Sequence, residues 1–228
     1  MVVNAEVREP TGGRFCNSTF RKGESMNRIS FALLALGLSL APVLCLAAEP
    51  NADKAKAIAE IEKLGGKVTI DEKSPGKPVI GVSFCDRKVT DAGLKCLKGL
   101  TSLHTLILRG TKVTDEGLSQ LKGMTTLQSL NLGYTHVTDE GLAHLKGLIN
   151  LQVLILGNTK LTNAGLGHLK GLSNLHTLLL GHTTVTDAGL ENLKELSQLQ
   201  SLYLGSTKVT DEGVKKLQKA LPNCTIDR

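Results

Sequence analysis

Leucines recur along this chain in a pattern that repeats every 24 residues. From Leu100 onward, five blocks follow one another without an insertion, and a degenerate sixth copy precedes them at residues 77–99. The first full block reads LTSLHTLILRGTKVTDEGLSQLKG. A period of this length is typical of solenoids, in which each repeat buries its apolar residues only by stacking on its neighbours.

Each block predicts the same two elements. The leucines within residues 103–108 have the spacing of a short strand with one buried face. Residues 114–118, Thr-Asp-Glu-Gly-Leu, predict the capped, acidic start of a helix, and Lys122-Gly123 predict its basic last turn and its end. The stacked blocks therefore predict a parallel sheet on one side and short helices on the other.

Two further columns recur with the block, and we expect both to be structural. A threonine hydroxyl both donates and accepts hydrogen bonds, so the threonine column can tie a turn carbonyl to the neighbouring coil. The glycines of the predicted helices are explained by tight packing on the convex side. The threonines are Thr111, Thr135, Thr159, Thr183 and Thr207, and the glycines are Gly93, Gly117, Gly141, Gly165, Gly189 and Gly213.

The two ends of such a stack expose apolar residues and need covers. Residues 51–64 have a helical pattern that places Ile58, Ile61 and Leu64 on one face. A strand is expected at residues 67–70 and a last irregular strand at residues 221–226. The predicted organisation is therefore an N-terminal helical cap at 49–76, six repeats at 77–219 and a C-terminal cap at 220–228.

The segment that precedes the cap predicts export. Residues 26–28 begin a basic stretch, residues 29–40 are nearly all apolar, and Leu46-Ala47-Ala48 supply small residues. Residues 26–48 thus predict a signal peptide cleaved after Ala48 or Ala47, and a mature protein that is secreted or periplasmic, in the cell envelope, without a membrane span. Residues 1–25 lack periodicity and are interpreted as an upstream extension of the reading frame or a long leader.

Composition and motifs narrow the function. The net charge is only +6, and the chain has no Trp and 3% aromatic residues, so nucleic-acid binding is not expected. The sequence contains no G-x-S-x-G, H-E-x-x-H, C-x-x-C or G-x-x-x-x-G-K-[ST] motif. We therefore expect no enzymatic activity, no cofactor and no metal site.

The register of the leucines resembles the leucine-rich repeat, L-x-x-L-x-L-x-x-(N/C)-x-L. The ending Val-Thr-Asp-x-Gly-Leu-x-x-Leu resembles the ribonuclease-inhibitor-like and cysteine-containing branch of that superfamily. Together with the signal peptide, the phrases IEKLGG and LPNC resemble small secreted repeat proteins of planctomycete-type bacteria. Over residues 50–228 this resemblance implies an α/β solenoid, a short horseshoe arc with a parallel concave sheet and short convex helices, and a protein-binding role.

The strand residues between the buried leucines form the predicted binding face. Their central column is rich in large apolar side chains that face solvent, which is typical of a contact surface, although such residues also suit strands for their own sake. The predicted partner-binding residues are Ile107, Asn131, Ile155, Leu179 and Tyr203 on the strands, and Tyr134, Asn158 and His182 on the loop edge just beyond them.

Three other features leave alternatives open. A loop-edge cationic row, Lys88, Lys112, His136, Lys160, Thr184 and Lys208, suits an acidic partner or an anionic glycan, or is a solvated face. His144 and His168 share a position in adjacent blocks but lack a third metal ligand. Among the thiols of Cys85, Cys96 and Cys224 no pair has bridging geometry, which leaves an intermolecular disulfide through Cys224 as a further alternative.

These observations predict an exported, non-enzymatic module that recognises a protein or an envelope partner through its concave face. The alternative is a structural, self-associating component of the envelope, and an oligomer is compatible with either hypothesis.

Overall fold

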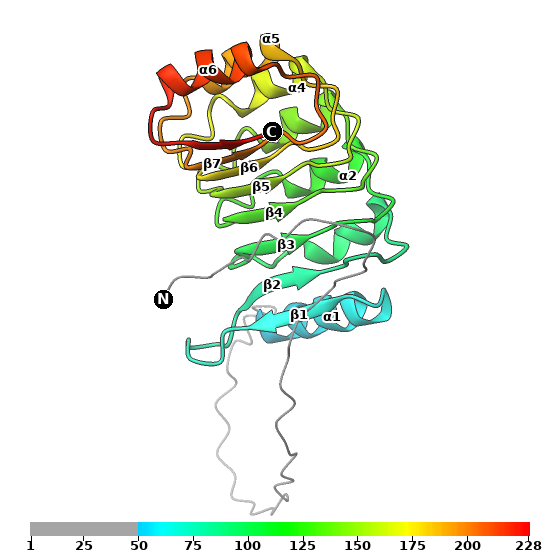
Figure 1. Ribbon diagram of the computed structural model, residues 1–228. Coiled ribbons are helices and arrows are strands. Elements are labelled where there is room, and N and C mark those ends of the chain that lie inside the picture. Colours follow the sequence, from blue (N-terminus) through cyan, green and yellow to red (C-terminus); the bar gives the residue numbers. More distant parts are fainter. Residues whose placement is uncertain (1–49) are drawn as a thin grey trace, which may run out of the picture. The chain divides into compact units, whose positions relative to one another are not determined.

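The structure is a computed structural model that describes residues 50–228 (Figure 1). The expected extension at residues 1–25 and the expected signal peptide at residues 26–48 lie outside the described residues. Within residues 50–228, the coils follow one another in a curved stack with the strands on its inner side (Figure 1). This arrangement is the α/β leucine-rich-repeat solenoid that the 24-residue period predicts.

One open sheet runs through the stack in the strand order β1-β2-β3-β4-β5-β6-β7-β8. Strand β1 is antiparallel to β2, whereas every later neighbour is parallel and pairs in register with the equivalent residue of the next coil. The strands are β1 (Lys67–Ile70), β2 (Val79–Ser83), β3 (Thr105–Ile107), β4 (Ser129–Asn131), β5 (Val153–Ile155), β6 (Thr177–Leu179), β7 (Ser201–Tyr203) and β8 (Thr225–Asp227).

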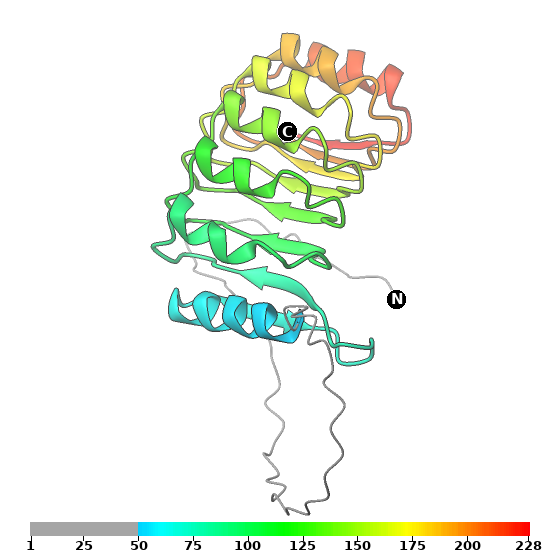
Figure 2. The ribbon, with the colours of Figure 1, turned by 180° about the vertical axis from the view of Figure 1, so that it is seen from behind.

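Short helices stack side by side on the other side of the sheet (Figure 2). In four coils a single α-turn passes directly into a 3₁₀ turn. These pairs are α2 (Asp115–Leu118) with η2 (Ser119–Leu121), α3 (Asp139–Leu142) with η3 (Ala143–Leu145), α4 (Asn163–Leu166) with η4 (Gly167–Leu169), and α5 (Asp187–Leu190) with η5 (Glu191–Leu193). The degenerate copy has only the 3₁₀ helix η1 (Asp91–Leu97), and the last coil has the longer helix α6 (Asp211–Ala220).

The leucines of the repeat form one continuous aliphatic core. Leu103, Leu106 and Leu108 are fully buried, and so are the helical Leu118 and Leu121 of the same block. Equivalent side chains of the next coils lie directly above them, because the parallel strands pair in register. Burial of a leucine is worth roughly 1.5–3 kcal/mol, so the repeated rows supply most of the stability.

Both ends of the core are covered. Helix α1 (Pro50–Lys63) buries Ala57 and Ile61 completely or nearly so, while Ile58 and Leu64 are only partly buried. Phe84 stands where other coils have leucine, and its ring fills the space against Gly66, at which a Cβ would lie 2.6 Å from the ring. At the other end, Leu217, Leu221 and Cys224 of α6 and the following turn are buried.

The threonine column differs from the prediction. Thr111 donates its hydroxyl to the Leu108 carbonyl of its own coil, at 2.6 Å, and not to the neighbouring coil. The same bond recurs from Thr135, Thr159, Thr183 and Thr207 to the leucine three residues earlier. The expectation of an inter-coil tie was wrong because the tight turn brings the carbonyl of the preceding leucine closest to the buried hydroxyl.

Aspartates provide the inter-coil tie. The Asp115 carboxylate accepts hydrogen bonds from the backbone amide (2.8 Å) and the hydroxyl (2.7 Å) of Thr138 in the next coil. The same pair of bonds recurs at Asp91 with Thr114, Asp139 with Thr162 and Asp187 with Thr210. Asn163 replaces aspartate in one coil and holds Thr186 in the same way, because its amide nitrogen donates to the hydroxyl.

This tie also explains the glycine column more specifically than tight packing does. A Cβ on Gly141 would overlap the Asp115 carboxylate of the preceding coil, with its Cγ at 3.0 Å. Asp91, Asp139, Asn163 and Asp187 stand in the same relation to Gly117, Gly165, Gly189 and Gly213. The Asp, Thr and Gly positions of the block are therefore one structural unit that joins two coils.

The hydroxyl and the amide of Thr210 lower the pKa of Asp187 below its ordinary value. A carboxylate with a lowered pKa in the folded state stabilises the fold above its unfolded-state pKa, and this contribution disappears as the pH falls through the folded-state pKa. The bonds between Asp187 and Thr210 therefore weaken in acid.

Within the part of the chain that the structure describes, none of the helices has the length and hydropathy required to cross a membrane.

Candidate functional site

The strand residues predicted to bind a partner lie in one row on the inner face of the sheet. We call Ile107, Asn131, Ile155, Leu179 and Tyr203 the concave row. Each of them pairs directly with the next across parallel strands β3 to β7. All are half-buried, so they are less exposed than the sequence suggests, because neighbouring members of the row shield one another. The row still presents a continuous, mainly apolar surface.

The predicted loop-edge residues have an unusual backbone conformation. Tyr134, Asn158 and His182 have φ values of 57°, 58° and 57°, in the left-handed region, and Gly110 occupies the equivalent position of the first block. Asparagine and histidine are tolerated there more readily than an aromatic residue. Tyr134 is nevertheless 53% exposed and contributes nothing to the core. The fold therefore holds a large side chain in a strained position in contact with solvent.

Arg109 lies against Tyr134, a contact that the repeat pattern of the sequence does not predict. The guanidinium carbon is 4.7 Å from the centroid of the Tyr134 ring, which is the geometry of a cation–π interaction. Arg109 also forms an ion pair with Asp86 at 3.4 Å. Burial lowers the pKa of Arg109, but the neighbouring Cys85 and Asp86 outweigh it and the net pKa lies above its ordinary value. Arg109 is therefore a fixed positive charge next to an exposed aromatic ring.

One signal could have revealed Arg109. Four successive coils have glycine at its position, namely Gly133, Gly157, Gly181 and Gly205. At the other end of this glycine column, the ring of Tyr203 packs against Gly181, where a Cβ would lie 2.6 Å from the ring. The column is therefore bounded by Arg109 at one end and by the ring of Tyr203 at the other.

The cysteines do not support a disulfide through Cys224. None of the three cysteines among the described residues forms a disulfide. Cys224 is only 4% exposed, so it cannot meet a second chain without local unfolding. Burial raises the pKa of Cys224, and it raises that of Cys96 to about 11. Cys96 also donates its thiol to the Gly93 carbonyl at 2.9 Å. Both thiols are thus poor nucleophiles.

Residues 52–228 contain no group of three or more His, Cys, Asp and Glu side chains placed to hold a metal ion. His144 and His168 are half-exposed on η3 and η4.

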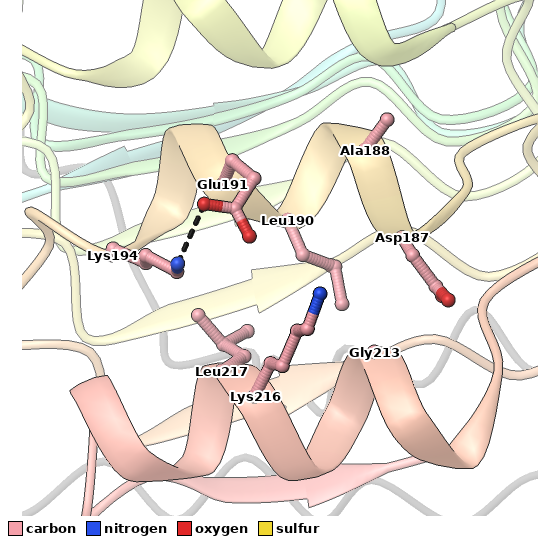
Figure 3. A pocket seen from close by; sticks show the side chains of 8 residues that line it. All are labelled: Asp187, Ala188, Leu190, Glu191, Lys194, Gly213, Lys216 and Leu217. Carbon is pink, nitrogen blue, oxygen red and sulfur yellow. Dashed lines mark hydrogen bonds and ion pairs between the residues drawn. The ribbon is translucent and has the colours of Figure 1, made fainter.

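A shallow groove lies between α5 and α6 (Figure 3). Two carboxylates and two ammonium groups line it, and Lys194 pairs with Glu191 at 2.6 Å. Because Asp187 already binds Thr210, the groove has no free, converging set of acid and base.

The geometry defines a solenoid with a mostly parallel sheet and an open, mainly apolar inner face, and comparison with known proteins agrees. The family described as "Leucine Rich repeat" matches residues 99–122, 123–145 and 196–217. These three segments are therefore leucine-rich repeats, in agreement with the fold. A search of curated proteins found no match to it.

Two internalins of Listeria monocytogenes have similar solved structures. Internalin C2 (inlC2) is 26% identical, with a TM-score of 0.51, and the match covers 78% of this chain and 82% of that one. The internalin inlF is 24% identical, with a TM-score of 0.50, over 58% of this chain. The match spans only 36% of the inlF chain. These likenesses concern the fold.

The side chain of Tyr134 is expected to contribute little to the stability of the fold. We expect Tyr134→Asn to change the free energy of unfolding by less than about 1 kcal/mol, because relief of the left-handed strain offsets the lost contact with Arg109. Tyr134→Phe keeps the ring and the strain and serves as the control. Urea unfolding of both variants tests this expectation. A loss of more than about 2 kcal/mol in Tyr134→Asn would show that the side chain is required for folding.

Proposed function

We propose that this chain is an exported, non-enzymatic protein-binding module that recognises its partner through the concave row and the loop edge. The observation that carries the proposal is the apolar concave row, with exposed Tyr134 and the charge of Arg109 beside it. Tyrosine and arginine are the residue types that dominate binding energy at protein interfaces. Stacked repeats of this kind present extended concave surfaces that serve binding.

The surface matches what a protein partner requires. The centre of a protein interface is apolar and poor in charge, and its rim is polar. Ile155 and Leu179 supply such a centre on adjacent strands. On the loop edge, half-buried Asn158 and exposed His182 provide a polar rim. Export rests on residues 26–48, which lie outside the described residues.

The experiment is a cross-linking pull-down from envelope and soluble fractions of the source cell. We expect the unmodified protein to capture a specific partner, and Ile155→Glu with Leu179→Arg to reduce capture at least tenfold, because charges replace the apolar centre of the row. Ile155→Thr with Leu179→Thr is the milder variant, since threonine suits a strand. Circular dichroism checks that each variant is folded.

The matched control carries two charge changes on the helical face. Glu116→Lys with Lys215→Glu leaves the net charge unchanged, and both residues are exposed. This control should capture the partner as the unmodified protein does. Equal capture by all variants would contradict the proposal.

The second candidate is a structural, self-associating component. Strand β8 ends the sheet and pairs only with β7 among the described residues, which leaves a free edge for a second copy. Light scattering during size exclusion distinguishes the two functions. A monomer at all concentrations favours recognition, whereas concentration-dependent oligomers that persist in the concave variants favour assembly.

A further inference from the structure

Besides the loop-edge cationic row, a second row of positive charge lies on the opposite edge of the stack, where the helices end. Five successive coils place a lysine at the same position, immediately after the 3₁₀ turn. We call these residues the helix-end lysine row: Lys98, Lys122, Lys146, Lys170 and Lys194. Because the short helices lie side by side (Figure 2), their last residues form a line along the stack.

Four of these lysines have no compensating charge. Lys98, Lys122, Lys146 and Lys170 are exposed, and the ion pairs among residues 52–228 include none of them. Lys194 differs, because it pairs with Glu191 and precedes Glu195. Like charges in adjacent coils repel one another, so the free protein keeps an unfavourable arrangement over four coils.

Helix capping does not explain the row. A lysine in the last turn can donate to free helix carbonyls. Here backbone N–H groups of the following turn donate to these carbonyls instead. Met124 N–H donates to Leu121 O (3.1 Å), and Leu148 N–H donates to Leu145 O (2.9 Å). No side chain of Lys98, Lys122, Lys146 or Lys170 donates a hydrogen bond to a described residue. The ammonium groups are therefore available to a ligand.

The surroundings of the row are open and polar. Each of these four lysines is followed by a glycine, and a Cβ on Gly99, Gly123 or Gly147 would have no atom within 4 Å. Thr101, Thr125 and Ser173 are exposed on the same turns, and Ile149 is the exposed apolar exception. A protein partner would require an apolar centre, which this strip lacks.

We propose that the helix-end lysine row binds a linear anionic polysaccharide that carries sulfate or carboxylate groups. The coils repeat at about 4.8 Å on the strand side and more widely on the helix side, so the row is at least about 14 Å long from Lys98 to Lys170. A chain laid along it meets one ammonium group per coil. This site lies apart from the concave row, so it provides a second binding surface and does not depend on the proposed protein partner.

The test uses the full chain and a heparin-derived octasaccharide as the probe. The variant Lys122→Gln, Lys146→Gln, Lys170→Gln is compared with Lys88→Gln, Lys112→Gln, Lys160→Gln, which removes the same charge from the loop-edge cationic row. We expect the helix-end variant to bind at least tenfold more weakly at physiological salt, and the loop-edge variant to change less than threefold. Titration calorimetry gives the dissociation constants, and thermal unfolding confirms that both variants are folded.

Three results would overturn the proposal. Equal weakening in both variants would show that net charge alone governs binding. Absence of measurable binding by the unmodified protein would show that the row is a solvated face. Tighter binding of polyglutamate than of the octasaccharide would show that the row selects an acidic polypeptide.

Discussion

Phe84→Ala is expected to cost about 3–5 kcal/mol and to unfold the amino-terminal cap, because the ring is fully buried against Ile61 and Gly66. Each coil of a solenoid contacts only its neighbours, so the loss should concentrate near the end of the stack. Hydrogen exchange should accelerate in α1, β1 and β2, while β5 to β7 remain protected. Exchange measured by mass spectrometry, together with urea unfolding, checks both expectations.

The chain itself suggests the control for this prediction. The equivalent residues of the other coils are leucines, so Phe84→Leu restores the repeat and should cost less than about 1.5 kcal/mol. If Phe84→Ala and Phe84→Leu destabilise equally, the aromatic ring does not seal the cap. If exchange accelerates uniformly over all coils, the stack unfolds as one unit.

A double-mutant cycle at Asp115 and Gly141 is expected to show strong coupling. Gly141→Ala alone should destabilise by about 1–3 kcal/mol, because the added methyl group overlaps the Asp115 carboxylate. Asp115→Ala alone should cost about 1–3 kcal/mol through the loss of both bonds to Thr138. Once the carboxylate is absent, Gly141→Ala should become neutral or stabilise by up to about 1 kcal/mol, since alanine favours helices.

The coupling energy is thus expected to be about 1–3 kcal/mol, measured by urea unfolding of the four proteins. Asp115→Asn is the control, because Asn163 holds Thr186 in the equivalent unit with both of its bonds. Additive effects of the two alanine substitutions would mean that the glycine is required for another reason, such as the contact with Val137.

The sequence predicts the coils well because a 24-residue period fixes which residues face the core. Leu103, Leu106 and Leu108 are buried as expected, and the strands and helix starts recur once per block. Each of these features depends on residues within one repeat, where the spacing of residues along the chain determines which side chains share a face.

Contacts between coils are harder to predict. The aspartates form a visible column, but whether a carboxylate faces solvent or a threonine 23 residues later depends on the offset between coils. The contact of Arg109 with Tyr134 joins different positions of two blocks, so it has no repeating signal. Phe84 was missed because its partners belong to the cap, outside the repeat. The thiol of Cys224 is buried by α6 and the last turn, whose path no repeat specifies.

The proposed function requires that a partner binds on the inner face of the sheet. Site-specific photo-cross-linking tests it most directly, with a benzoylphenylalanine placed in turn at Tyr134, at Tyr203 and, on the helical face, at Glu116. We expect one partner to be cross-linked from both Tyr134 and Tyr203 and not from Glu116. Cross-links to that partner from Glu116 alone would contradict it and would place recognition on the helical face.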